Sequence, residues 1–96
     1  MRVRYTPRAR NDLDAIYLYL DRRSHSGASA VKSAIERSIR YLADFPFIAP
    51  ITEATGIHEL TIIRYPYKVY YRIENDEVWI VHVRHTSRRP PTVTEL

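Results

Sequence analysis

The apolar residues of this chain follow a helical spacing up to Pro46 and give way to runs of β-forming residues after it. Before Pro46 they recur every three or four positions, which predicts two amphipathic helices, one over about 7–23 and one ending near residue 44. The two stripes are Ala9, Leu13, Ile16, Tyr17 and Leu20, and then Ala28, Val31, Ile35, Ile39, Leu42 and Phe45. We therefore expect helices and strands to be combined in one fold.

Short sequence features mark where these helices begin and end. Thr6 is a good N-cap residue, and Pro7 suits the first helical position because its missing N–H would have no partner there. The run Ser24-His25-Ser26-Gly27 is typical of turns and caps, so we expect a gap of about four residues between the helices. A gap this short predicts an antiparallel helical hairpin.

Four segments favour β-strands, because they alternate polar and apolar residues or are rich in β-forming residues. They are residues 2–5, 57–63, 67–74 and 77–85. Asn75 and Asp76 tolerate the positive φ angles of a two-residue turn, so the last two strands are predicted to form a hairpin. The segment 47–56 contains Pro50 and Gly56 and is predicted to be a surface loop.

The two-residue turn fixes which residues of this hairpin face each other. The expected pairs are Ile73–Val78, Tyr71–Ile80, Tyr70–Val81 and Tyr67–Arg84. Both faces carry apolar residues, which predicts central strands with the helices on one side.

These elements predict an α+β fold in the order β-α-α-β-β-β, with the helical hairpin packed on one face of a small antiparallel sheet. At 96 residues the chain is expected to form a single domain over 1–96. Pro90 and Pro91 disfavour both helix and sheet, so residues 86–96 are predicted to form an extended tail.

Composition excludes several kinds of site. The absence of cysteine rules out a disulfide framework, a cysteine nucleophile and a zinc knuckle. Two glycines are too few for a phosphate-binding loop, and His82 and His85 would point to opposite faces of one strand, so we expect no cofactor and no metal. Without a long apolar run or a signal-peptide pattern, we expect no membrane association and a cytoplasmic location.

The charge balance is basic but does not by itself decide the kind of partner. The net charge is +4, and thirteen of the fifteen basic residues are arginine. Arginine presents a planar fork of donors that suits phosphates and carboxylates, although a GC-rich genome would give the same bias. The balance is compatible with a nucleic acid or with an acidic protein.

Basic and aromatic residues gather at one end of the predicted sheet. Arg84, His85, Arg88 and Arg89 end the last strand, and Arg64 and Tyr67 lie at the ends of neighbouring strands. Cations, a phenol and an imidazole could together hold a phosphodiester and move its protons. The alternative is a solvated basic rim whose tyrosine rings cover the core.

Four motifs occur in the order seen in a known family. The first helix contains Ala-x-x-Asp-Leu-x-x-Ile at 9–16, and the second ends in Leu-Ala-x-Phe-Pro at 42–46. The stretch Arg-Tyr-Pro-Tyr-Lys-Val-Tyr-Tyr-Arg-Ile follows at 64–73, and Val-x-Val-x-His-x-x-x-Arg at 81–89. Over roughly residues 3–89 the chain resembles the RelE/ParE superfamily of toxins from type II toxin–antitoxin systems.

The resemblance implies one of two activities. RelE-like members are metal-independent endoribonucleases that cut mRNA on the ribosome; here Arg64 and His85 would be the catalytic residues. ParE-like members bind DNA gyrase without known hydrolytic chemistry. In either case Arg84, Arg88, Arg89 and Tyr67 would bind the phosphate or the target. The implied effects are growth inhibition and plasmid stabilisation, and the implied partner is a cognate antitoxin, in a hetero-oligomer or beside a toxin homodimer.

Departures from the RelE pattern favour the ParE-like activity. Thr86 and Ser87 follow His85 where nucleolytic relatives have a tyrosine, and Lys68 is the only lysine of the predicted sheet. Glu59 could stand where some nucleases carry an acidic base. We therefore expect a gyrase-binding toxin, with the ribosome-dependent ribonuclease as the alternative.

Overall fold

Two helices and four strands follow one another in the predicted β-α-α-β-β-β order. The structure is a computed structural model and describes residues 1–87, 91 and 96. Its elements are β1 (Arg2–Tyr5), α1 (Pro7–Arg23), α2 (His25–Asp44), β2 (Ile57–Thr61), β3 (Tyr67–Glu74) and β4 (Glu77–His85). The α+β class is confirmed, and β2 ends two residues earlier than the sequence suggested.

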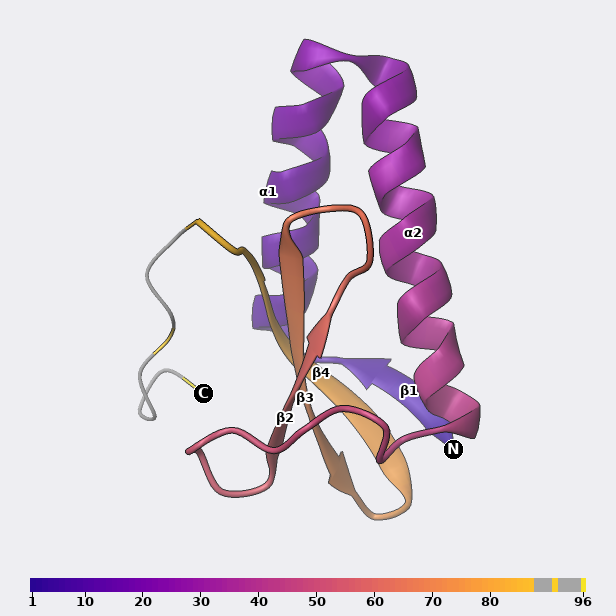
Figure 1. Cartoon of the computed structure of the whole chain (residues 1–96), viewed down its shortest axis with the longest axis vertical. Helices are drawn as coiled ribbons and strands as arrows, with labels where there is room; N and C mark the ends of the chain where they lie inside the picture. The colour runs from indigo at the N-terminus through magenta and orange to yellow at the C-terminus, as the bar shows by residue number, and fades with distance from the viewer. Residues whose placement is uncertain (88–90, 92–95) are drawn as a thin grey trace.

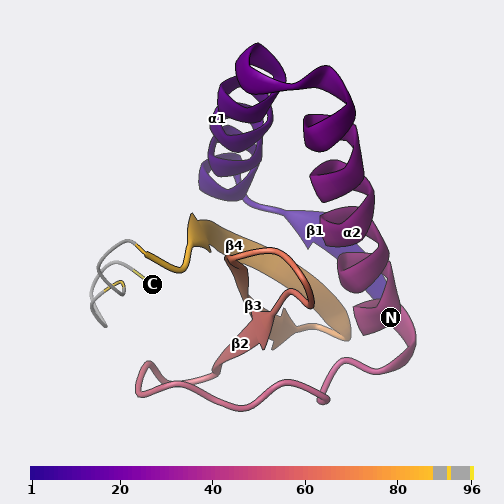
Figure 2. The ribbon, with the colours of Figure 1, turned by 45° about the horizontal axis from the view of Figure 1, so that its top comes forward.

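The four strands form one sheet in the order β1-β4-β3-β2. The expected antiparallel arrangement holds for β2, β3 and β4, and β1 adds a parallel strand at the edge of β4. Figure 1 shows α1 and α2 side by side as a hairpin whose tip projects beyond the sheet. Seen from the second direction, the hairpin lies on one side of the sheet, with α1 near β4 and α2 near β1 (Figure 2).

A single residue, Ser24, separates the two helices, so the expected four-residue gap is wrong. The Ser24 N–H donates to Leu20 O at 2.9 Å and ends α1, while the Ser24 hydroxyl accepts the Gly27 N–H at 3.1 Å and begins α2. One serine thus serves as the C-cap of one helix and the N-cap of the next. The predicted start of α1 is confirmed, since the Thr6 hydroxyl accepts the Ala9 N–H at 3.2 Å.

The β3–β4 hairpin turns at Asn75 and Asp76, which have φ angles of 52° and 58° as a two-residue turn requires. The predicted pairs nearest the turn, Ile73–Val78 and Tyr71–Ile80, are confirmed. Beyond them the predicted register is wrong, because the pairing shifts between Tyr70 and Tyr71. The corrected pairs are Tyr70–His82, Lys68–Arg84 and Tyr67–His85, in place of Tyr70–Val81 and Tyr67–Arg84. Val81 is the extra residue of a β-bulge on β4.

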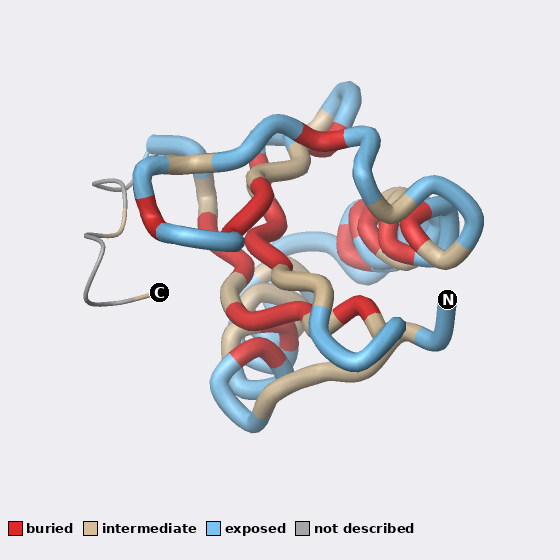
Figure 3. Tube along the Cα trace, turned by 90° about the horizontal axis from the view of Figure 1, so that it is seen from below, coloured by how far each residue is buried: buried red, intermediate tan, exposed pale blue. Residues whose placement is uncertain are grey.

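Both faces of the central strands are covered. The main core lies between the sheet and the helices, and its largest fully buried side chains are Ile35, Ile39, Leu42, Val69, Tyr71, Val78 and Ile80. A second cluster on the outer face contains Ala54, Ile57, Tyr70 and Val81, with Trp79 and Leu96 packed against it. Figure 3 shows buried segments along the strands and on the inner side of the helices. The two clusters confirm that β3 and β4 are central strands.

The segment 47–56 is a loop, as predicted, and is joined to β2 by an isolated bridge between Ile51 and His58. Of the predicted tail over 86–96, residues 88–90 and 92–95 lie outside the described part of the chain. Within the described residues, neither helix has the length and apolarity needed to cross a bilayer.

Candidate functional site

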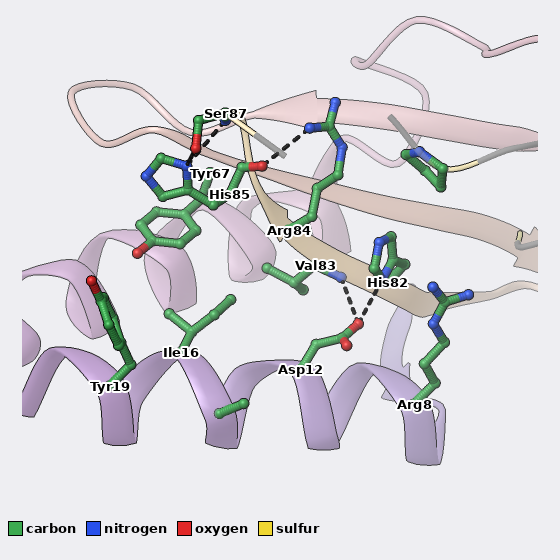
Figure 4. A pocket seen from close by; sticks show the side chains of 12 residues that line it. Arg8, Asp12, Ile16, Tyr19, Tyr67, His82, Val83, Arg84, His85 and Ser87 are labelled. Carbon is green, nitrogen blue, oxygen red and sulfur yellow. Dashed lines mark hydrogen bonds and ion pairs between the residues drawn. The ribbon is translucent and has the colours of Figure 1, made fainter. Parts of the chain in front are cut away.

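A cavity of about 600 Å³ lies between α1 and the part of β4 that β1 leaves uncovered. The β1 pairing ends at Tyr5–Ile80, whereas β4 continues to His85. The cavity is lined from α1, β3 and β4, and its polar lining includes Arg8, Asp12, Tyr19, Tyr67, His82 and His85. In Figure 4 these side chains lie along the groove, with Arg8 and His82 toward one end and Tyr67 and His85 toward the other.

Asp12 of α1 replaces the missing strand at the edge of β4. Its Oδ2 accepts the Val83 N–H at 3.0 Å and lies 2.7 Å from Nδ1 of His82. Because a carboxylate can only accept, Nδ1 of His82 carries the hydrogen in this pair. The His82 ring also stacks on Tyr70, with ring centroids 5.6 Å apart. The His82 side chain is only 12% exposed, so this pair fixes α1 against β4.

His85 stands at the other end of the cavity with the opposite tautomer. Its Nδ1 accepts the Ser87 N–H at 3.0 Å and lies 2.6 Å from the Ser87 hydroxyl. A backbone N–H can only donate, so the hydrogen of the neutral imidazole is on Nε2. The ring packs edge-on against Tyr67 at 5.2 Å. His82 and His85 therefore belong to opposite faces of β4, as their spacing predicted.

Arg84 is buried on the outer face of the sheet, with 7% of its surface exposed. Its Nε donates to the Tyr70 hydroxyl at 2.9 Å, and its Nη1 donates to the carbonyls of His85 and Thr86 at 3.1 and 3.4 Å. The guanidinium also lies over the Tyr70 ring, 5.8 Å from its centroid. All of these acceptors belong to the protein itself, so the guanidinium is occupied by intramolecular contacts.

Comparison with known proteins decides the family. Residues 3–90 match the family described as the ParE toxin of the type II toxin–antitoxin system parDE. The chain belongs to this ParE toxin family. A protein of Sinorhizobium fredii (strain NBRC 101917 / NGR234) named as a suspected toxin, Y4kP, is 32% identical over 92 residues, which cover 96% of this chain and 95% of Y4kP. The chain is thus a toxin of a type II toxin–antitoxin system, and the resemblance to the RelE/ParE superfamily is confirmed.

Two solved structures share the fold of this ParE-family toxin. A chain of the chromosomal ParDE system from P. aeruginosa has a TM-score of 0.80 at 23% identity, covering 91% of this toxin and 97% of that chain. A chain of the intact E. coli RelBE toxin–antitoxin complex has a TM-score of 0.70 at 12% identity, covering 91% of this toxin and 98% of that chain. The fold is therefore common to ParE and RelE proteins.

The structure of the toxin brings only some of the predicted site residues together. Tyr67, Arg84 and His85 all line the cavity, although the Arg84 side chain turns to the outer face. Arg64 is exposed in the β2–β3 turn with a φ angle of 80°, and it is not among the described residues that line the cavity. Arg88 and Arg89 lie outside the described residues.

Two other features bear on the chemistry of the toxin. Glu59, the candidate acidic base, forms an ion pair with Lys68 on the neighbouring strand. Among residues 1–87, 91 and 96, no three His, Asp or Glu side chains lie close enough together to hold a metal ion.

Sequence reasoning missed Asp12, His82 and Ser87 as residues of the toxin's cavity. One indication was available for Asp12, which lies in the 9–16 motif beside Leu13 of the apolar stripe. A carboxylate at the border of a buried helix face can reach a strand edge. His82 and Ser87 gave no such indication, because their partners depend on the bulge at Val81 and on the end of β4.

Proposed function

We propose that this toxin inhibits growth by binding DNA gyrase. The observation that carries the proposal is the match to the ParE toxin family over residues 3–90. The geometry supports it, because Arg84 is buried against Tyr70 and Arg64 lies in a turn away from the cavity. Arg64 and Arg84 thus do not converge on one phosphate as they would in a ribonuclease site. Since gyrase is a cytoplasmic enzyme, we place the toxin in the cytoplasm.

The proposed contact surface is the end of β4 together with the chain that follows it. His85 lines the cavity there beside Tyr67, which is itself buried, and the sequence continues with Arg88 and Arg89. Basic residues at this end would steer the toxin toward an acidic surface of the target.

A supercoiling assay with purified toxin and gyrase tests this proposal. We expect inhibition by the intact toxin and its loss when residues 88–96 are removed. Truncation after Ser87 keeps the bond from the Thr86 N–H to Pro66 O at 2.7 Å and the Ser87–His85 contact, so the end of β4 should persist. It also removes Leu96 from the outer cluster and Pro91 from the cavity lining, so the fold of the truncated toxin is checked first. Leu18→Ser, an exposed change on α1, is the matched control and should leave inhibition unchanged.

Either of two results would count against this assignment. Normal supercoiling at toxin concentrations that stop growth would exclude gyrase as the target. Full inhibition by the truncated toxin, with its fold verified by circular dichroism, would exclude the tail as the contact surface.

We also propose that a cognate antitoxin neutralises the toxin by placing an acidic segment beside α1 and β4. The toxin carries a net charge of +4, and the cavity lies along a strand edge that β1 leaves uncovered. An extended segment could add to such an edge, and a helix could lie along the groove. Affinity should fall as salt is raised, since the rim charges are exposed. A product of the adjacent gene that does not bind the toxin would contradict this.

The second candidate function is ribosome-dependent cleavage of mRNA. It is favoured by one observation, the Nε2–H of His85 beside Tyr67 at the cavity. In that case Arg64 would contact the scissile phosphate and His85 would transfer a proton, so Arg64→Ala and His85→Ala should each lower cleavage about 100-fold or more. Primer extension on translated mRNA after toxin induction tests it, and uncut mRNA in growth-arrested cells would exclude it.

A further inference from the structure

The last residues of β4 have a neighbouring strand on one side only, β3, and a buried side chain adds further bonds to their backbone. The ladder between β3 and β4 ends at the Tyr67–His85 pair, and β1 stops earlier, at Ile80. The backbone continues through Thr86 and Ser87, where the proposed target surface begins. We propose that Arg84 is a positioning residue that fixes this end of the chain and so orients His85 and Ser87.

The first step is the burial of Arg84. Only 7% of its surface is exposed, and Tyr70 both accepts a hydrogen bond from its Nε and offers its ring face to the guanidinium. Burying a guanidinium is unfavourable unless its donors are satisfied, so such a residue is held in one conformation by its partners. A cation in this position is poorly placed to contact a target directly.

The second step is where the other donors go. Nη1 donates to the carbonyls of His85 and Thr86, the two residues at which the chain leaves the sheet. Arg84 therefore ties the outer face, through Tyr70, to the backbone of the strand end. The planar guanidinium donates to the phenol through Nε and to the carbonyls through Nη1, two fixed positions, whereas the ammonium of a lysine donates from one point on a flexible side chain.

The third step concerns the opposite face. Side chains alternate along a strand, so His85 points toward the cavity while Arg84 points away from it. The bond from the Ser87 N–H to Nδ1 of His85 needs the backbone of 85–87 to follow one path. The Thr86 N–H is bonded to Pro66 O, and Arg84 holds the carbonyls of His85 and Thr86 in addition. Arg84 thereby contributes to the direction in which Nε2 of His85 faces the cavity.

The consequence for toxicity rests on the proposed function, which places the target surface at this end of β4. Three changes separate the contacts. Arg84→Gln and Arg84→Lys remove the fork, whereas Tyr70→Phe removes only the phenol and leaves the bonds to the carbonyls. Lys68→Gln is the matched control. Lys68 lies opposite Arg84 in the β3–β4 register, but its side chain forms an ion pair with Glu59.

The structural readouts are the ¹⁵N shifts of the His85 ring and the amide exchange of Thr86 and Ser87. For both Arg84 variants we expect the ring to lose its single tautomer and the two amides to exchange about tenfold faster than global unfolding explains. Lys68→Gln should keep the wild-type signature, and Tyr70→Phe, which keeps the bonds to the carbonyls, should change it less than either Arg84 variant. Arg84→Gln could fail to fold. Arg84→Lys keeps the positive charge, so its ring shifts and amide exchange are compared with those of the wild type in the same way.

The functional readout is growth inhibition after induction, together with the toxin concentration that half-inhibits supercoiling. Both Arg84 variants should need about tenfold more toxin. An unchanged His85 signature in folded Arg84→Lys, or full toxicity despite its loss, would overturn the positioning role. If the wild type stops growth without inhibiting gyrase, but Arg84→Lys is still less toxic, the gyrase proposal fails and the positioning role stands.

Discussion

The carboxylate of Asp12 accepts the backbone N–H of Val83 at 3.0 Å, and so takes the place that β1 vacates on the edge of β4. Asp12 thus supplies a hydrogen-bond acceptor to the edge of β4 beyond the point where β1 ends, at Tyr5. Its second contact, with Nδ1 of His82, adds a charge-assisted bond at the same oxygen. This oxygen connects the helical hairpin to the half of β4 that carries the site.

We expect Asp12→Ala to lower the free energy of unfolding by about 1–3 kcal/mol, because it leaves the Val83 N–H and the His82 ring without their acceptor. Urea denaturation monitored by circular dichroism measures the loss. Asp14→Ala, an exposed change two residues along the same helix, is the control and should cost less than about 0.5 kcal/mol. Equal losses from both variants would contradict the role given to Asp12.

Arg64→Gly should separate stability from function. Arg64 has a φ angle of 80°, which strains any residue with a Cβ, so glycine should raise the free energy of unfolding by about 1 kcal/mol. If the Arg64 side chain contacts the target, toxicity should fall at the same time. Thermal unfolding and growth inhibition are measured together, and a more stable toxin with undiminished toxicity would remove Arg64 from the functional surface.

The turn between β3 and β4 offers a second stabilising change. Asp76 has a φ angle of 58°, and Asn-Gly is the preferred pair for this turn, so Asp76→Gly should stabilise the fold by up to about 1 kcal/mol. Asp76→Ala, which keeps a Cβ but loses the local tolerance of aspartate, should destabilise it. Thermal unfolding should show a higher melting temperature for Asp76→Gly and a lower one for Asp76→Ala. A lower melting temperature for Asp76→Gly would contradict the strain assigned to this turn.

Tyr17 should make the toxin sensitive to alkaline pH. Among the described residues its buried hydroxyl has no hydrogen-bond partner, and burial, followed by the charge of Glu36, raises its pKa above the ordinary tyrosine value. Above pH of about 10 the unfolded chain loses this proton while the folded chain keeps it, so the free energy of unfolding falls as pH rises.

Tyr17→Phe is the variant that tests this. It should flatten the alkaline decline in stability and, at neutral pH, raise the free energy of unfolding by about 1 kcal/mol, because no buried hydroxyl is left unpaired. Tyr19→Phe, on the exposed side of the same helix, is the control. Identical pH profiles for the wild type and Tyr17→Phe would show that Tyr17 ionises normally.

The elements were predictable from the sequence because local rules determine them. The stripe from Ala28 to Leu42 can bury only one helix face, and Asn75-Asp76 suits a two-residue turn. The register beyond Ile80 was not predictable, because a bulge depends on packing between strands and leaves no mark in the alternation of residues. That one extra residue exchanged the partner of Tyr67 from Arg84 to His85.

The candidate site was harder to predict for a related reason. An arginine near a strand end is usually solvated, and nothing local shows that Arg84 turns to Tyr70 instead. The Asp12–Val83 contact joins residues far apart in sequence, so it appears only once α1 and β4 are packed. Long-range contacts of this kind determine the cavity, whereas short-range patterns determine the helices and the hairpin.

The parallel pairing of β1 with β4 also determines when the cavity can form during synthesis. β1 is made before the helices but cannot pair until β4 has followed, because Arg2 pairs with Glu77 and Tyr5 with Ile80. The helical hairpin needs only local contacts and can form early, whereas such distant pairings form late. The β4 edge and the cavity therefore cannot form before residues 77–85 have been synthesised. A fragment that stops short of β4 contains the helical hairpin but not the cavity.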